Sequence, residues 1–323
     1  NYTLDKKELF KEADESLISA PKNGYIEEDT KNGFRVVKLG RVSPTALHNM
    51  MECAWKFDYY IKYFESHNIE KNVMVWLPPN EKGNLFHQVF QEYCDAMLKG
   101  KKLNTSDALD LSVLKDIFDN AVAEFEMLVA KGSNQAYDME KALIWEQIKE
   151  YMEALYADLK NSSEGWAVKE CEREFETDNI YIDETGEYVS SDGSCDVIEF
   201  SYHGFLDRID SYIDDTNVEH ARIIDYKTGK KDNLEKKIKN NTQIQHAIYS
   251  MAVLEEVDYF SYDFPCDNNL RIEKKDKDIS ELPKVFRERM ADILLNNNYN
   301  LYNDSACEYC DYKNICVHRM NLD

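Results

Sequence analysis

Two short segments of the sequence combine acidic residues with a lysine in a spacing that suits metal-assisted chemistry. The first is His203-Gly-Phe-Leu-Asp207-Arg-Ile-Asp210, and the second is Ile223-Ile-Asp225-Tyr-Lys227-Thr-Gly229. Both are predicted to be strands separated by a turn, so Asp207 and Asp225 would meet on one face of a hairpin. Residues two apart on a strand share a face, which directs Asp225 and Lys227 into one site. Two carboxylates and a lysine favour a hard divalent cation with an activated water. The alternative is a surface hairpin with an ordinary Asp/Lys pair.

Two further segments flank this pair in the chain. Gly83-Asn-Leu-Phe-His87 places a histidine at the start of a predicted helix, and Gln245-His-Ala-Ile-Tyr249 puts Gln and Tyr on one helical face. The four segments follow one another in an order that resembles the RecB-like branch of the PD-(D/E)XK nuclease superfamily. The resemblance extends over about residues 43–316, most of the chain.

The resemblance implies a role for each of these residues. Asp207 and Asp225 would be metal ligands together with the Tyr226 carbonyl, and His87 would be the additional ligand of this branch. Lys227 would orient or polarise the attacking water and counter charge on the scissile phosphate. The expected metal is Mg²⁺ or Mn²⁺, and the imidazole shifts the preference toward Mn²⁺.

A helix and a further acid complete the site that the resemblance implies. Gln245 and Tyr249 match a helix that supports the site and contacts the nucleic acid. Glu172 resembles the acidic position that precedes the sheet in these enzymes, and Glu170 and Glu174 compete for that role. Taken singly, His87 is more often a helix-surface residue, and Gln245 and Tyr249 more often pack at the edge of a core.

The last three of eight cysteines form a second constellation, Cys307-x2-Cys310-x5-Cys316. This spacing is typical of thiolate ligands for a soft metal. Three thiolates need a fourth ligand, and Cys53 is the best candidate although it lies far away in the sequence. His318 is an alternative to one of the cysteines.

The split arrangement of cysteines resembles a RecB-like subgroup, namely AddB-type helicase–nuclease subunits and the iron–sulfur nucleases of CRISPR adaptation. The resemblance implies that a [4Fe–4S] cluster on Cys53, Cys307, Cys310 and Cys316 joins the two ends of the domain. Such a link would remove entropy from the unfolded chain, as a disulfide does. The relatives usually have Pro after the first cysteine, where this chain has Ala54. A structural Zn²⁺ site is the alternative.

The charge of the chain is distributed unevenly along the sequence. The 323 residues include 39 Lys+Arg and 62 Asp+Glu, a net charge of −23, which by itself disfavours a polyanionic partner. Residues 106–200 hold 24 acids and 7 bases, a balance of −17, mostly in predicted helices whose acids would face solvent. Residues 227–240 instead contain six lysines and two acids. This basic run is either a solvated loop or a rim that steers the phosphate backbone.

Hydrophobic periodicity predicts one α/β domain with a large helical insertion, and the resemblance implies a restriction-endonuclease-like core of mixed β-sheet flanked by helices. The predicted helices are residues 4–18, 43–64 (capped by Ser43 and opened by Pro44), 84–98, 109–128, 136–159, 241–256 and 283–295. The predicted strands are residues 34–39, 167–177, 188–190, 197–202, 204–212, 221–226, 257–262 and 270–274. Within a single nuclease domain, 1–323, we expect N-terminal helices with His87 and Cys53 (43–105), the insertion (106–165), the catalytic sheet (166–275) and a C-terminal helix with the cysteines (276–323).

These observations favour a metal-dependent deoxyribonuclease, an exonuclease of DNA repair or recombination. The sequence begins without Met and has no Gly-x4-Gly-Lys-Ser/Thr motor motif, so we expect a free-standing enzyme or the nuclease part of a helicase–nuclease. The expected partners are DNA, single-stranded or end-exposed duplex, and a helicase domain or subunit. No apolar stretch is long enough for a membrane span, and a cytoplasmic location is expected. The alternatives are a catalytically inactive DNA-binding or assembly module of the same fold, and a zinc-stapled interaction domain.

Overall fold

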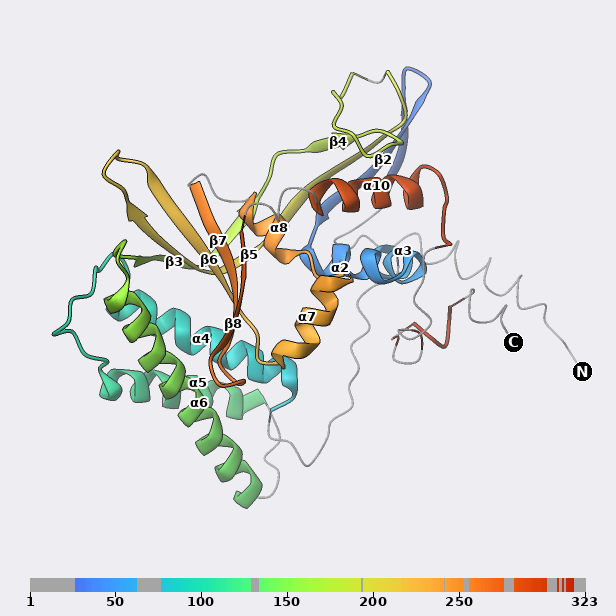
Figure 1. Cartoon of the computed structure of the whole chain (residues 1–323). Coiled ribbons are helices and arrows are strands. Elements are labelled where there is room, and N and C mark those ends of the chain that lie inside the picture. Colours follow the sequence, from blue (N-terminus) through green and yellow to red (C-terminus); the bar gives the residue numbers. More distant parts are fainter. Residues whose placement is uncertain are drawn as a thin grey trace, which may run out of the picture. The chain divides into compact units, whose positions relative to one another are not determined.

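The computed structural model describes residues 27–62, 77–128, 134–192, 194–240, 242–251, 256–275, 282–300, 307, 310 and 312–316. The helices are α2 (Pro44–Glu52), α3 (Ala54–Lys62), α4 (Pro79–Met97), α5 (Leu111–Leu128), α6 (Asn134–Asn161), α7 (Lys231–Lys239), α8 (Gln245–Ser250) and α10 (Leu282–Leu294) (Figure 1). The strands are β1 (Glu27–Lys31), β2 (Phe34–Val42), β3 (Ala167–Glu176), β4 (Ile180–Ile182), β5 (Val197–Ile213), β6 (Glu219–Tyr226), β7 (Glu256–Phe264) and β8 (Leu270–Lys274). The chain divides into two compact units. The first unit comprises Asn1–Asn68, Glu176–Gly204 and Leu282–Asp323, and the second unit comprises Ile69–Phe175 and Phe205–Glu281.

The first unit combines helices α2, α3 and α10 with strands β1, β2, β4 and the first part of β5. β2 pairs antiparallel with β1 and parallel with β5, and β4 pairs antiparallel with β5. The predicted cap of α2 is confirmed, because the Ser43 hydroxyl accepts a hydrogen bond from Ala46 N at 3.2 Å and Pro44 is the first helical residue. The predicted single helix over 43–64 is wrong. Cys53 adopts an extended conformation, which ends α2 and begins α3.

One glycine allows α10 to approach a turn of the first unit. Gly186 has a φ of +80°, and a Cβ atom there would lie 2.5 Å from the backbone nitrogen of Glu288 on α10. Arg287 on the same helix donates hydrogen bonds to the Gly186 carbonyl and the Tyr188 hydroxyl, at 3.0 and 2.8 Å. Only glycine combines this backbone conformation with so close an approach.

The second unit is built on the second part of β5 and on strands β6, β7 and β8. β5 and β6 are antiparallel with Arg208 opposite Ile224, β6 and β7 are parallel, and β7 and β8 are antiparallel. β3 also pairs with β5. The predicted strands at 197–202 and 204–212 are one continuous strand, β5, which runs through the boundary between the units.

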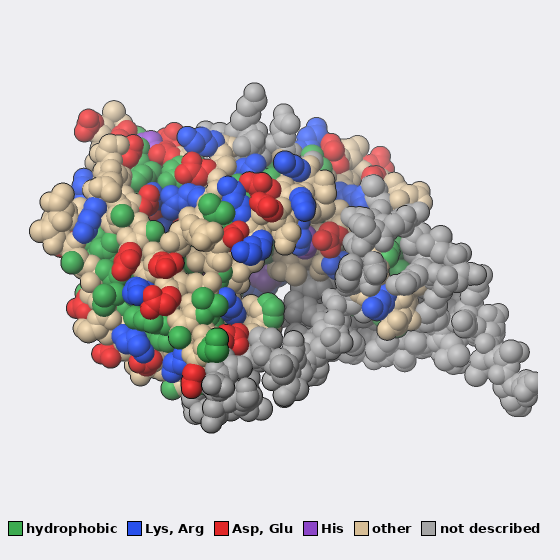
Figure 2. All heavy atoms as spheres, turned by 60° about the horizontal axis from the view of Figure 1, so that its bottom comes forward, with side chains coloured by type: hydrophobic (Ala, Val, Ile, Leu, Met, Phe, Trp, Pro, Cys, Tyr) green, Lys and Arg blue, Asp and Glu red, His purple; other side chains and the backbone are tan. Residues whose placement is uncertain are grey.

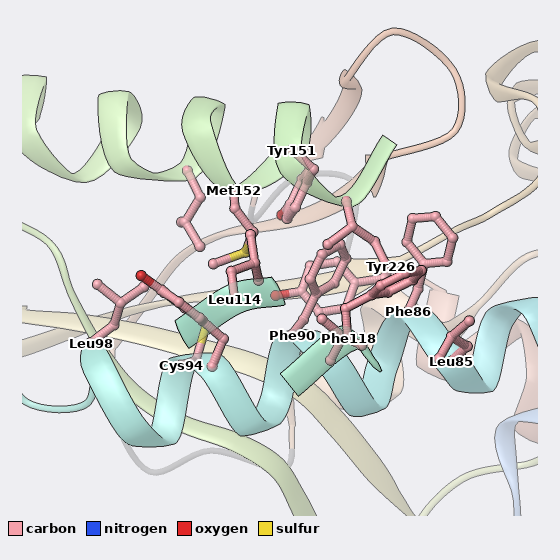
Figure 3. Packing of buried hydrophobic residues seen from close by; sticks show 14 of the residues in the cluster. Leu85, Phe86, Phe90, Cys94, Leu98, Leu114, Phe118, Tyr151, Met152 and Tyr226 are labelled. Atoms are coloured by element: carbon pink, nitrogen blue, oxygen red, sulfur yellow. The ribbon is translucent and has the colours of Figure 1, made fainter. Parts of the chain in front are cut away.

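Helices α4, α5 and α6 pack against the sheet of the second unit through a large apolar core (Figure 1). The rings of Phe90 on α4, Tyr151 on α6 and Tyr226 on β6 meet in this core, with centroids 4.7–5.6 Å apart (Figure 3). On α6, Ile144 and Ile148 are fully buried in this core, whereas Leu143 is 56% exposed. The buried face of this helix therefore includes the two isoleucines and leaves Leu143 outside it.

A closed ring of charged and polar side chains joins α6 to four strands of the second unit. Its successive members are Arg208, Asp210, Arg222, Asp158, Arg271, Asp263 and Tyr151, and each lies 2.5–3.5 Å from the next. Arg208 is fully buried and also donates a hydrogen bond to the Tyr226 hydroxyl at 2.9 Å. Arg208 Nε lies 3.0 Å from Asp210 Oδ1. This contact is an ion pair without hydrogen-bond alignment, and neither atom makes a hydrogen bond elsewhere within the described residues. Alternating signs let this ring remain charged inside the protein.

Several other predicted elements differ from the structure. The strand predicted at 188–190 is reduced to one bridge between Tyr188 and Ile182, and β4 was not predicted. The basic run contains helix α7 rather than only a loop. Of the helix predicted at 241–256, the described residues form α8 (Gln245–Ser250). The helix predicted at 4–18 lies outside the described residues.

The architecture as a whole agrees with the predicted fold class. The eight strands form a mixed sheet in the order β1-β2-β5-β6-β7-β8, with β3 and β4 each paired to β5, and helices flank it. This is the restriction-endonuclease-like α/β arrangement. No helix within the described residues is long and apolar enough to cross a membrane.

The buried ring predicts a large stability cost for removing its central cation. Arg208→Met leaves the Tyr151 and Tyr226 hydroxyls without their cationic partner and the buried Asp210 carboxylate with only one of its two cations, Arg222. We expect the variant to lose about 3–5 kcal/mol of unfolding free energy in urea denaturation. The exposed pair Lys99–Asp95 at the C-terminal end of α4 offers a control, since Lys99→Met should cost at most about 1 kcal/mol. Equal stability of the two variants would contradict a structural role for the ring.

Candidate functional site

Three side chains from three elements of the second unit gather beside the middle of strand β5. His87 comes from α4, Glu172 from β3 and Asp207 from β5, and one ligand atom of each lies within 4.8 Å of the others. His87 Nδ1 is 2.9 Å from Glu172 Oε1 and 3.7 Å from Asp207 Oδ1. An imidazole and two carboxylates form a donor set suited to a divalent cation.

Of the three glutamates near the start of the sheet, the structure brings Glu172 to this group. Glu170 instead pairs with Arg173 at 3.2 Å, and Glu174 is exposed on the strand. Glu172 has a φ of +46°, in the left-handed region that residues other than glycine rarely adopt. Such strain persists where the surrounding structure determines it, and it clusters at functional sites.

The second acidic segment lies next to the first, as the sequence predicts. The Tyr226 backbone N–H donates a hydrogen bond to Asp207 Oδ2 at 2.6 Å, and one further step of the β5–β6 register sets Asp207 opposite Asp225. Lys227 Nζ lies 2.5 Å from Asp225 Oδ2, an ion pair in which the buried oxygen makes no aligned hydrogen bond within the described residues. Asp225 is not part of the three-residue group, so its role as a ligand and that of the Tyr226 carbonyl stay predictions.

The site concentrates negative charge in a buried place. Burial, followed by the neighbouring charge of Asp225, raises the pKa of Asp207 to about 7. Burial alone would lower the pKa of His87, but the charges of Asp207 and Glu172 outweigh it and raise this pKa to about 9. The charge of neighbouring carboxylates contributes to both pKa shifts, after burial for Asp207 and against burial for His87. A bound divalent cation would neutralise this negative charge.

The predicted Gln–Tyr helix is α8, and it borders the same acids. Gln245 Nε2 donates a hydrogen bond to the Tyr249 hydroxyl at 3.3 Å. Burial, followed by the charges of Asp225 and Asp207, raises the pKa of this hydroxyl well above its usual value, so the phenol stays protonated. Gln243, which sequence reasoning missed, reaches the Gln245 side-chain oxygen at 2.5 Å. No motif in the sequence distinguishes Gln243 from its neighbours.

The four predicted cluster cysteines line one small cavity of about 20 Å³ in the first unit, with residues of α3 around it. Burial raises the pKa of the Cys53 thiol, and Cys307 and Cys316 are near enough to raise it further. The C-terminal segment contacts α3 here, because the Tyr59 and Tyr312 rings stack with centroids 5.7 Å apart. The predicted alternative ligand His318 lies outside the described residues.

A different cavity, of about 740 Å³, lies beside the C-terminal end of α6 in the second unit. Its lining includes Asp158, Trp166, Arg222 and Tyr259, and none of the predicted site residues. Arg222 there is already paired with Asp210 and Asp158. The size of this cavity therefore gives no reason to move the candidate site away from His87, Glu172 and Asp207.

The strained backbone of Glu172 allows its stability cost to be separated from its role in metal binding. Glu172→Gly and Glu172→Ala both remove the carboxylate, but only glycine adopts a φ of +46° without strain. We expect the Gly variant to have a free energy of unfolding about 1 kcal/mol higher than that of the Ala variant in urea denaturation. In Mn²⁺ titration calorimetry both variants should bind at least about tenfold more weakly than wild type.

Glu174→Ala is the matched control, since it removes an exposed acid from the same strand. It should leave Mn²⁺ affinity unchanged. Unchanged affinity in the two Glu172 variants would remove Glu172 from the site.

Comparison with known proteins agrees with this geometry. The profile of the PD-(D/E)XK nuclease superfamily matches residues 41–317, a span that contains the three-residue group, the Asp225–Lys227 pair, α8 and all four cluster cysteines. No curated protein matches the chain. Divalent metals serve the nucleases of this superfamily, and the donor set of His87, Glu172 and Asp207 fits such a metal. The chain belongs to the PD-(D/E)XK nuclease superfamily.

Proposed function

We propose that this protein is a metal-dependent DNA exonuclease that acts in DNA repair or recombination, either alone or as the nuclease part of a helicase–nuclease. The observation that carries the proposal is the convergence of His87, Glu172 and Asp207 beside the Asp225–Lys227 ion pair. The order of the motifs, which is that of the RecB-like branch, supports an exonuclease rather than another nuclease of the superfamily.

Each residue of the site has a distinct task in this proposal. A divalent cation bound there would lower the pKa of a water molecule and offset charge on the phosphate. His87, Glu172 and Asp207 would hold this cation, and the Tyr226 N–H fixes the Asp207 carboxylate. Lys227 supplies positive charge where the phosphoryl oxygens become more negative.

Asp225 and α8 complete the arrangement around that lysine. Asp225 orients Lys227 through their ion pair and adds to the negative field that favours the cation. α8 borders the site with the protonated hydroxyl of Tyr249, which Gln245 holds in place. A neutral donor beside acids is suited to a phosphate oxygen of the substrate.

Helix α7 gives the substrate strand a basic surface that follows the site directly in the chain. Only residues 228–230 separate Lys227 from Lys231, the first residue of this helix. Lys236 and Lys239 are exposed on α7 and make no ion pair within the described residues. We infer that these two lysines contact phosphates of the substrate, with the salt dependence typical of such contacts.

The rest of the surface offers little general attraction for DNA. Figure 2 shows one face on which acidic and basic side chains are interspersed rather than gathered into separate patches. With a net charge of −23, the protein would bind DNA weakly away from the site. Weak intrinsic affinity supports dependence on a helicase domain or subunit that delivers the strand.

We also propose that Cys53, Cys307, Cys310 and Cys316 hold a [4Fe–4S] cluster. The support is that all four line one cavity although about 250 residues of chain separate Cys53 from the other three. A cluster there would join α3 to the C-terminal segment and reduce the entropy of the unfolded chain. Zn²⁺ is the competing occupant, since it also accepts four thiolates.

The nuclease proposal predicts that cleavage depends on the acid and the lysine of the ion pair. Asp225→Asn and Lys227→Met should each lower the rate of cleavage of end-labelled linear DNA by at least about 100-fold in Mg²⁺ or Mn²⁺. Lys230→Met is the matched control, because Lys230 is exposed and pairs with Asp267 on the surface. It should retain most of the activity.

Circular DNA of the same sequence separates the two modes of cleavage. An exonuclease leaves the circle intact and degrades the linear form. Cleavage of both forms would assign endonuclease activity to the protein instead. Equal activity of wild type, Asp225→Asn and Lys227→Met would overturn the catalytic assignment and leave a DNA-binding module.

The cluster proposal predicts iron and acid-labile sulfide in protein purified without oxygen. Cys310→Ala should lose the metal and lower the melting temperature by several degrees, because the link between α3 and the C-terminal segment is lost. Cys195→Ala is the control, since Cys195 lies in the first unit but does not line the cavity. Zinc without iron in the anaerobic protein would assign the site to Zn²⁺ instead.

A further inference from the structure

Phe205 is a large apolar side chain that is left half exposed on the strand that carries Asp207. It is 50% exposed, whereas the residues that follow it on β5, Leu206 and Asp207, are buried. Residues two apart on a strand share a face, so Phe205 and Asp207 lie on the same face of β5. Leu206 and Arg208 take the opposite face, toward the core.

The fold does not account for this ring. Phe205 has no aromatic or cationic partner within the described residues, whereas Phe200 on β5 and Phe260 on β7 are fully buried in ring contacts. Half of its surface faces water, where an apolar side chain contributes little to stability. What distinguishes Phe205 from the other exposed apolar side chains is its place on the same face of β5 as Asp207.

The position of Phe205 relates it to the reacting phosphate. The β5–β6 ladder ends with Arg208 opposite Ile224, and Phe205 lies three residues beyond that pair, on the side where β6 continues to Lys227. Phe205 and Asp207 are two positions apart on the strand, about 6.6 Å along the backbone. This is the scale of the separation between a phosphate and a base of the same or the next nucleotide.

We propose that Phe205 is the platform on which a base of the substrate strand stacks while the neighbouring phosphate occupies the site of His87, Glu172 and Asp207. This inference rests on the proposed nuclease function and names its substrate. A base that stacks on a protein ring has left its own duplex, so the site takes a single strand or a frayed end. Stacking tolerates any base because every base has a π-face, which suits an enzyme without sequence preference.

The test pairs protein variants with changes in the DNA. Wild type, Phe205→Ala and Phe205→Trp are compared on single-stranded oligonucleotides that are intact or abasic at one defined position. Anisotropy of labelled DNA gives the affinity in parallel with KM and kcat. Ile213→Ala is the matched control, since Ile213 is 65% exposed at the C-terminal end of the same strand, eight positions from Phe205.

We expect Phe205→Ala to bind intact DNA about 5- to 150-fold more weakly and to show a KM higher by a similar factor, the range for one stacked base. Wild type should lose a similar factor when the base at the critical position is removed. Phe205→Ala should be indifferent to that removal, because the base and the ring are one interaction. Phe205→Trp should retain affinity, and Ile213→Ala should behave as wild type.

Other outcomes overturn the inference. Losses from Phe205→Ala and from the abasic position that simply multiply would show that the ring and the base do not touch. A change in oligomeric state in Phe205→Ala would assign the ring to contact between copies of the chain. If wild type fails to cleave, the nuclease proposal falls, and the anisotropy comparison still decides whether the base stacks on Phe205.

Discussion

The contact between Arg208 and Tyr226 is the constraint on which the candidate site depends. Arg208 is fully buried and donates a hydrogen bond to the Tyr226 hydroxyl at 2.9 Å, across strands β5 and β6. Because side chains alternate along a strand, holding these two residues on the core face turns their neighbours to the opposite face. Those neighbours are Asp207, Asp225 and Lys227. A buried cation on one face of the sheet thus sets the positions of the acids on the other.

The cost of that arrangement is distributed over the rest of the second unit. A buried guanidinium requires compensating charge, which Asp210 supplies, and Asp210 in turn is shared with Arg222. The ring then closes through α6, β8 and β7, so helix α6 and the strands that carry Asp207 and Asp225 belong to the same network. Glu172 adds a local strain, since its left-handed backbone costs about 1–2 kcal/mol. The strained backbone at Glu172 lowers the stability of the fold, and the surrounding charge network and core packing offset that loss.

Sequence reasoning succeeded where the chemistry lies in contiguous residues and failed where it depends on distant ones. The shared face of Asp207, Asp225 and Lys227 can be predicted from the sequence, because side chains alternate along a strand. Glu172 could not be chosen over its neighbours, because its φ of +46° departs from the regular alternation that sequence reasoning assumes. Helix α7 was hidden by its charge, since only Leu234 and Ile238 supply an apolar face. The ring of buried and half-buried charges joins residues from 151 to 271, and no local pattern reveals such a closure.

The two proposed metal sites belong to different units of the chain, and strands β3 and β5 each have residues in both units. The cysteine cavity belongs to the first unit and the candidate metal centre to the second. The boundary at Phe175–Glu176 falls at the end of β3, three residues after Glu172, and the boundary at Gly204–Phe205 falls within β5, two residues before Asp207. A slip of one residue in β5 would exchange the faces of Asp207 and Arg208. The pairing of β5 with β2 and β4 in the first unit therefore helps to keep the carboxylate in the site and the guanidinium in the core.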